Sequence, residues 1–114
     1  MTDRILRQLP QVHLYGQPSW HEDAFVIGNR TGLEALRSAI DKALRSGADE
    51  ALAFAIDGEG YGIKVIELRD AIMDEMPLPY TDPDAAEMTR RPWPDVVREF
   101  LREWSISRGI GKDF

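Results

Sequence analysis

A histidine and two carboxylates stand next to one another in this chain, at His21, Glu22 and Asp23. Imidazole nitrogens and carboxylate oxygens bind divalent metal ions, and a bound metal activates water for hydrolysis. With Asp57 as a fourth ligand, these residues suggest a small metal-assisted hydrolase. Adjacent side chains of an extended segment point in opposite directions, however, so three in a row do not converge on one ion. We therefore favour surface positions for them and expect no metal or other cofactor.

The segment Asp57-Gly58-Glu59-Gly60-Tyr61-Gly62 has closely spaced glycines like those of a phosphate-binding loop. It joins two β-prone runs instead of a strand and a helix, and its two carboxylates would repel phosphate. It also lacks the ligand series of an EF-hand. We interpret it as a hairpin turn. The alternative, which is compatible with a turn, is an exposed acidic tip that contacts a basic partner.

Other catalytic chemistries find little support in the residues. The chain has no cysteine, which excludes disulfides, thiolate metal sites and cysteine nucleophiles. Ser19 and His21 are too close in sequence to approach each other as nucleophile and base without an unusual turn. His13 lies on a predicted strand, facing away from Val12 and Leu14, and is expected to be a surface group or a local hydrogen-bond partner. These observations favour a non-catalytic protein.

The charge of the chain is concentrated in its middle. Eleven of the twenty acidic residues lie between Asp49 and Glu87, where only Lys64 and Arg69 oppose them, so this segment has a formal charge of −9 within a total of −6. Such a surface disfavours nucleic-acid phosphates and anionic lipid, and it attracts basic proteins. We therefore expect a basic protein partner, no nucleic acid and no membrane. A homodimer is compatible with this.

Aromatic residues in loops are typical anchors of protein interfaces. Trp20 and Tyr80 stand beside or near prolines in predicted loops, whereas Trp93 and Trp104 are expected to fold back and cover the core. Combining the exposed aromatics with the acidic residues gives six candidate partner-binding residues: Trp20, Asp57, Glu59, Asp74, Glu75 and Tyr80.

The first half of the chain predicts two strands followed by a helix. Residues 12–15 and 24–27 are short β-prone runs joined by a loop that allows a hairpin. Residues 31–46 have helical periodicity, with a capping box formed by Thr31 and Glu34 and a C-terminal glycine at Gly47. The apolar face expected to be buried comprises Leu33, Leu36, Ile40, Ala43 and Leu44.

The second half predicts a hairpin followed by helices. Residues 52–56 alternate large and small side chains, and the alanines of this strand would let a helix lie close. Residues 61–68 form its partner strand across the glycine-rich turn. Asp82 is expected to cap a short helix with Pro83 in its first turn, and a last helix opens at Pro92–Asp95 and ends near Trp104.

These elements predict a two-layer α+β domain with a four-stranded, largely antiparallel sheet in the order ββαββ. Helix 31–46 would cover one face, and the C-terminal helices would follow. We expect a single domain over residues 1–114, with flexible tails at 1–10 and 106–114. The longest apolar run, Ala51–Ile56, is too short to cross a bilayer, and the first residues lack a signal-peptide core, so a cytoplasmic protein is expected.

Two short motifs precede the predicted helix, Tyr15-Gly16-Gln17-Pro18-Ser19-Trp20-His21 and Ile27-Gly28-Asn29-Arg30-Thr31-Gly32-Leu33. Together with the helix, this half of the chain resembles small bacterial domains of uncharacterised or toxin-immunity type. The resemblance implies inhibition of a partner by direct binding and implies no catalytic residues. The sequence therefore favours a protein-binding module, for example an immunity protein or inhibitor, over the metal-assisted hydrolase.

Overall fold

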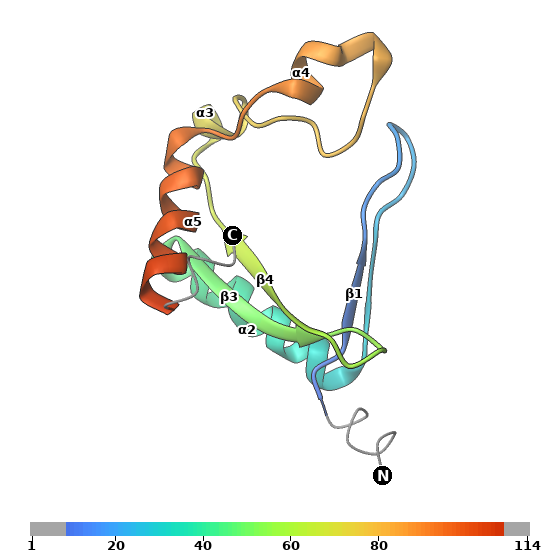
Figure 1. Cartoon of the computed structure of the whole chain (residues 1–114), viewed down its shortest axis with the longest axis vertical. Helices are drawn as coiled ribbons and strands as arrows, with labels where there is room; N and C mark the ends of the chain where they lie inside the picture. Colours follow the sequence, from blue (N-terminus) through green and yellow to red (C-terminus); the bar gives the residue numbers. More distant parts are fainter. Residues whose placement is uncertain (1–8, 109–114) are drawn as a thin grey trace. The chain divides into compact units, whose positions relative to one another are not determined.

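The computed structural model describes residues 9–108 and divides the chain into two compact units, Met1–Leu68 and Arg69–Phe114 (Figure 1). The first unit contains β1 (Val12–Tyr15), β2 (Phe25–Gly28), α2 (Arg30–Ser46), β3 (Ala48–Phe54) and β4 (Gly60–Ile66). The second contains α3 (Asp70–Met73), the 3₁₀ turn η1 (Pro83–Ala85), α4 (Ala86–Arg90) and α5 (Asp95–Arg108). The α+β class is therefore confirmed. Whether the chain is one domain stays a prediction.

The predicted four-stranded sheet is wrong, because the strands form two separate antiparallel pairs. β1 pairs with β2 from Val12 opposite Gly28 to Tyr15 opposite Phe25, and β3 pairs with β4 over seven residue pairs. A single parallel bridge, between Gln11 and Phe54, joins the two. The ladder stops there because β3 ends at Phe54, and Ala55 bonds instead to Glu59 across the turn.

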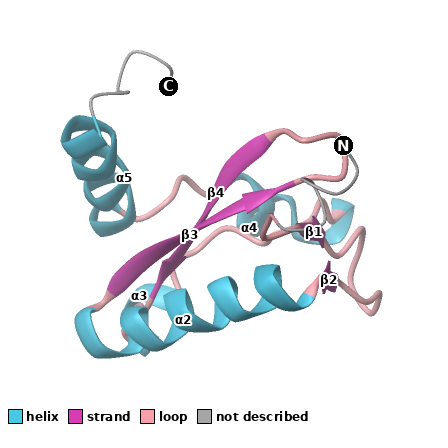
Figure 2. Cartoon of the chain, turned by 90° about the horizontal axis from the view of Figure 1, so that it is seen from below, coloured by secondary structure: helices cyan, strands magenta, loops and turns pink. Residues whose placement is uncertain are grey.

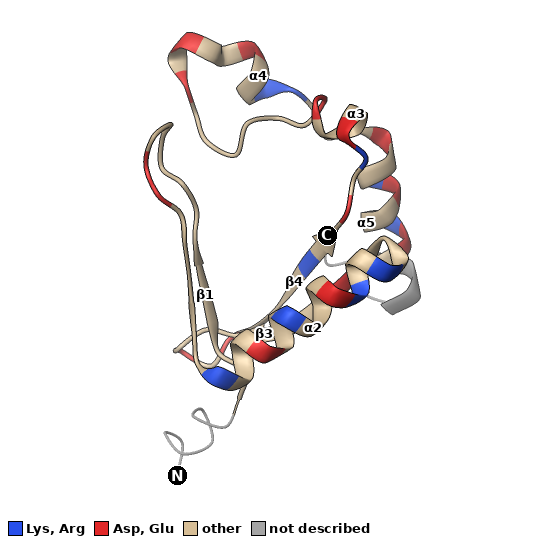
Figure 3. Ribbon diagram, turned by 180° about the vertical axis from the view of Figure 1, so that it is seen from behind, with Lys and Arg blue, Asp and Glu red and all other residues tan. Residues whose placement is uncertain are grey.

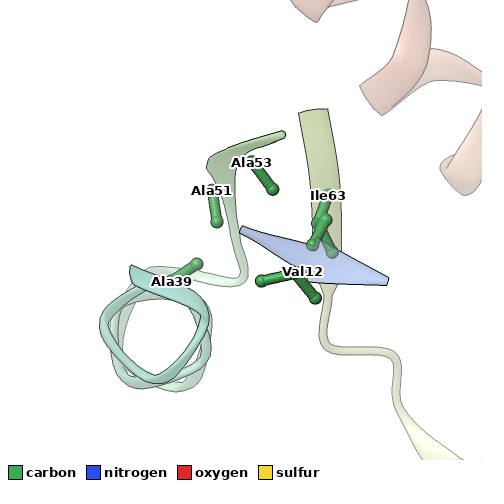
Figure 4. Packing of buried hydrophobic residues seen from close by; sticks show 5 residues of the cluster. All are labelled: Val12, Ala39, Ala51, Ala53 and Ile63. Carbon is green, nitrogen blue, oxygen red and sulfur yellow. The ribbon is translucent and has the colours of Figure 1, made fainter. Parts of the chain in front are cut away.

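The core of the first unit lies between α2 and one face of the β3–β4 pair, where Figure 2 shows the helix lying along the two strands. It consists of buried side chains from α2, β3, β4 and β1: Ala39, Ala51, Ala53, Ile63 and Val12 (Figure 4). The alanines of β3 face the helix, as the alternation of large and small residues predicts. The small side chains of Ala39, Ala51 and Ala53 let α2 and β3 approach closely.

The buried face of α2 agrees only in part with the predicted one, of which Ala43 is buried and Leu36 packs against the core. Gly32, Ala39 and Ala43 are buried, whereas Leu33, Ile40 and Leu44 are 42%, 42% and 63% exposed. The small residues are the buried ones because this side of the helix lies close to the backbone of Gln11. A Cβ placed on Gly32 would come within 2.2 Å of the carbonyl oxygen of Gln11. The bulky residues therefore lie on the side of the helix that faces outward.

The helix begins one residue earlier than predicted and is capped by a different residue. Asn29 is the N-cap, and its Oδ1 accepts a hydrogen bond from the amide of Gly32 at 2.8 Å. The predicted capping box of Thr31 and Glu34 is not formed, because Thr31 already lies inside the helix and Glu34 pairs with Arg30. The predicted C-terminal glycine is confirmed, since Gly47 has a φ of 101° and its amide donates to Ala43.

In the second unit, Asp82 caps η1 as predicted, accepting a hydrogen bond from the amide of Asp84 at 2.9 Å with Pro83 in the first position. The segment 69–76, which has no clear pattern in the sequence, contains the single turn of α3. The last helix, α5, runs to Arg108, beyond its expected end at Trp104. Residues 1–8 and 109–114 of the predicted tails lie outside the described residues.

Candidate partner-binding site

The six predicted partner-binding residues fall in four segments. Trp20 lies in the β1–β2 connection and Asp57 and Glu59 lie in the β3–β4 turn, both in the first unit. Asp74 and Glu75 follow α3 in the second unit, and Tyr80 precedes η1. Figure 3 shows acidic residues in the β1–β2 connection, in the β3–β4 turn and next to α3, and it shows that charge is sparse along the β1–β2 ribbon itself.

The β3–β4 turn is a hairpin turn, as predicted, and its acidic residues are exposed. Asp57 Oδ1 accepts a hydrogen bond from the amide of Glu59 at 3.0 Å, so this carboxylate stabilises the turn. Gly58 has a φ of 89°, a conformation that glycine adopts without steric cost. Both carboxylates remain available to solvent, and the turn is therefore also an acidic tip.

The β1–β2 connection does not form a metal site. The indole of Trp20, which is 58% exposed, lies against the imidazole of His21 with 4.0 Å between ring centroids. His21 has a φ of 67°, in the left-handed region. Within residues 9–108, no group of three or more histidine and carboxylate side chains is arranged to hold a metal ion. His21, Glu22, Asp23 and Asp57 are thus not brought together as ligands.

Asp74 and Glu75 line a hollow of about 410 Å³ in the second unit. Its other lining residues come from the segment that leads into α5 and from the first turns of that helix: Arg91, Pro92, Trp93, Pro94, Asp95 and Arg98. The side chain of Arg91 donates to the carbonyl oxygen of Asp74 at 2.8 Å, which holds the two segments together. Arg98 pairs with the carboxylate of Asp95 one turn earlier in the helix.

Trp93 is the functional candidate that the sequence analysis missed. It was expected to cover the core, but it is 45% exposed and lines the hollow beside Asp74 and Glu75. The signal lies in its neighbours, because Pro92 and Pro94 keep residue 93 out of the helix that follows. A tryptophan fixed in an extended segment before a helix does not belong to the buried helical face.

Tyr80 lies outside this hollow. It is half-buried, and its carbonyl oxygen accepts a hydrogen bond from Thr89 at 3.4 Å, which ties the loop before η1 to α4. Of the six predicted residues, Asp74 and Glu75 therefore share this hollow.

His13 makes one local contact, with the hydroxyl of Tyr15, as the sequence predicts, and it also accepts a hydrogen bond from the amide of Ile56, 43 positions away. It lines a second hollow, of about 250 Å³, with Tyr15, Tyr61 and three apolar residues of the first unit. The phenol of Tyr61 donates to the carbonyl oxygen of Val12 at 2.5 Å. Burial raises the pKa of the Tyr61 phenol above its ordinary value, because the phenolate would lose solvation there.

The comparisons with known proteins add no relative, since the chain matches no protein-family model, no curated protein and no solved structure. The resemblance to immunity-type domains therefore stays a prediction. Among the described residues, no helix is both long enough and apolar enough to cross a membrane.

Proposed function

We propose that the chain is a non-catalytic protein-binding module that binds a basic partner through Asp74, Glu75 and Trp93. An immunity protein or inhibitor is the form of such a module that the sequence favours. The observation that carries the proposal is the exposed indole of Trp93 beside two exposed carboxylates on one hollow. Interface energy is concentrated in tryptophan, tyrosine and arginine side chains that fill pockets.

The charges around the hollow favour a cationic ligand group. Its two arginines direct their hydrogen bonds to Asp95 and to the main chain of Asp74. The carboxylates of Asp74 and Glu75 are therefore not the groups that these arginines bind. A lysine or arginine of a partner can approach these carboxylates and lie over the indole of Trp93, a contact of about 0.5–2 kcal/mol depending on how far it is desolvated.

The two kinds of residue should affect binding differently. Charged residues at the edge of an interface mainly accelerate association and make it sensitive to salt. A buried tryptophan anchor mainly slows dissociation, and its removal costs about 2 kcal/mol or more when it is a hot spot. We therefore expect Asp74 and Glu75 to govern the rate of association and Trp93 to govern the lifetime of the complex.

The test uses matched variants of the full chain. Proteins captured from the host by the wild type are identified and purified, and their binding is measured at low and high salt. We expect Asp74→Lys/Glu75→Lys to slow association at least tenfold at low salt. Glu22→Lys/Asp23→Lys makes the same change in net charge at another exposed acidic pair and should have a much smaller effect.

The anchor is tested in the same way, with Trp93→Ala against Trp20→Ala. Both indoles are about half exposed in the free chain, so the two changes remove similar surfaces. Trp93→Ala should raise the dissociation rate, whereas Trp20→Ala should not. Equal effects of the two charge reversals and of the two tryptophan changes would refute this location for the site.

A further inference from the structure

His13 connects β1 to the turn that follows β3 through both nitrogens of its ring. The amide of Ile56 donates to Nε2 at 3.0 Å, and Nδ1 lies 2.7 Å from the hydroxyl oxygen of Tyr15. The first contact spans 43 positions in the sequence, whereas the second joins residues on the same strand.

The proton positions of the ring follow from these contacts. A backbone amide can only donate, so Nε2 must present its lone pair to Ile56 and carry no hydrogen. A neutral imidazole then carries its one hydrogen on Nδ1, where it is donated to the oxygen of Tyr15. The contact with Ile56 exists only while the ring is neutral.

This bond occupies the place where a β-ladder would otherwise continue. Gln11 bridges Phe54, and the amide of Phe54 donates to the carbonyl oxygen of Pro10 at 2.9 Å. His13 and Ile56 each lie two residues beyond the bridged pair Gln11 and Phe54. There the imidazole of His13, and not a backbone carbonyl, accepts the hydrogen bond from the amide of Ile56. A neighbouring hydrogen bond, from the hydroxyl of Tyr61 to the carbonyl oxygen of Val12, connects β4 to β1.

We propose that His13 is a proton-controlled latch between β1 and the β3–β4 turn. When the ring takes up a second proton, Nε2 gains a hydrogen that faces the N–H of Ile56, and the bond is lost. Histidine side chains titrate near neutral pH, about 6.5 in unfolded peptides. The latch is closed while the ring is neutral and opens when the ring is protonated. The segment that it releases begins at Ile56 and carries Asp57 and Glu59.

The groups around the ring support this direction. Tyr15 on β1 and Tyr61 on β4 are phenols, which stay neutral through the range in which histidine titrates. β2, which pairs with β1, has no titratable side chain over Phe25–Gly28. The turn beyond Ile56 carries two carboxylates, at Asp57 and Glu59.

The proposal is tested by nuclear magnetic resonance on the full chain labelled with nitrogen-15. At about pH 8 the His13 ring should be the tautomer with hydrogen on Nδ1. As the pH falls and the ring becomes protonated, the Ile56 amide should exchange with solvent about five- to tenfold faster than its intrinsic rate predicts, the factor expected from one typical net hydrogen bond. A ring with hydrogen on Nε2 at high pH, or an Ile56 amide that does not respond to the titration, would overturn the latch.

Two variants separate the proton from the side chain. His13→Gln keeps an oxygen acceptor that does not titrate in this range, so the protection of Ile56 should no longer depend on pH. His13→Leu removes the acceptor, so protection should be low throughout. The matched control is His21→Gln, which removes the only other histidine and should leave the response of the wild type intact. A response that persists in His13→Gln or disappears in His21→Gln would refute the assignment.

Discussion

The two hairpins of the first unit contain similar apolar residues but differ in what covers them. β3 and β4 present alanines, Ile63 and Val65 to α2, and this face is buried or nearly so. β1 and β2 have apolar side chains on both faces, and Phe25, Val26 and Ile27 are each more than half exposed. An isolated two-stranded ribbon is at best marginally stable in water. Both hairpins have apolar strands, so their sequences do not explain the difference. The face of β3–β4 is buried because α2 covers it, whereas the β2 side chains stay exposed.

The largest effect on stability is expected in the β3–β4 hairpin, which α2 covers. Ile63→Ala removes a side chain that is 9% exposed and leaves a cavity under α2. It should lower the free energy of unfolding by about 2–4 kcal/mol. Ile27→Ala deletes the same atoms from a side chain that is 58% exposed and should cost less than about 1 kcal/mol. Urea denaturation followed by circular dichroism measures both, and equal losses would mean that β2 is covered in solution.

A smaller effect concerns the junction between the start of β1 and the start of α2. Asn29 accepts hydrogen bonds from the amides of Gly32 and Gln11 and donates to the carbonyl oxygen of Leu9. Asn29→Ala should therefore lower the free energy of unfolding by about 1–2 kcal/mol, the range found for lost N-caps.

The control for this change is Thr31→Ala, at the position that the sequence predicts as the cap. Thr31 lies inside α2 and is exposed, so its replacement should cost less than about 0.5 kcal/mol. The same denaturation experiment serves for both variants. If Thr31→Ala proved the more damaging of the two, the capping geometry described above would be wrong.

The smallest expected effect is on the pH dependence of stability, and it concerns Tyr61, which connects β4 to β1. The pKa of Tyr61 is raised by burial, so the folded state favours the protonated phenol that donates to Val12. Its contribution to stability is complete below the pKa of an unfolded tyrosine, about 10, and is lost as the pH rises through the higher folded value. Tyr61→Phe should cost about 0.5–1.5 kcal/mol at neutral pH.

The alkaline range distinguishes this residue from the other tyrosines. The wild type should lose stability at alkaline pH more steeply than Tyr61→Phe, as measured by denaturation at a series of pH values. Tyr80→Phe serves as the control and should retain the alkaline loss. An equally steep loss in Tyr61→Phe would show that another group is responsible.

The sequence predicts the local elements of this chain well, because their signals are local. Gly47 ends α2, Asp82 caps η1, and the glycines of the 57–60 turn join β3 to β4, each as its own neighbours indicate. The buried face of α2 is predicted only in part, because hydrophobicity favours the leucines over Gly32 and Ala39. The close approach of Gln11 to Gly32, which selects the small face, is a contact between distant residues.

The candidate site shows the same division between local and distant information. The exposed acidic residues are visible in the composition, but their grouping is not. Asp74 and Glu75 share a hollow with Trp93 because the side chain of Arg91 reaches back to Asp74 across 17 positions. No periodicity in the sequence encodes that contact.

The hydrogen bonds of Asn29 also bear on how the chain folds as it is synthesised. Within residues 9–108, the partners of its side chain are Leu9, Gln11 and Gly32, which precede β3 in the sequence. The start of α2 can therefore be closed on the ribosome as soon as residues 9–32 have emerged, before the strands that bury its alanines exist. Since chains grow at about 5–20 residues per second, the capped helix has on the order of a second or more to form before it meets β3 and β4. The Asn29 hydrogen bonds at the start of α2 can thus form before the core with β3 and β4.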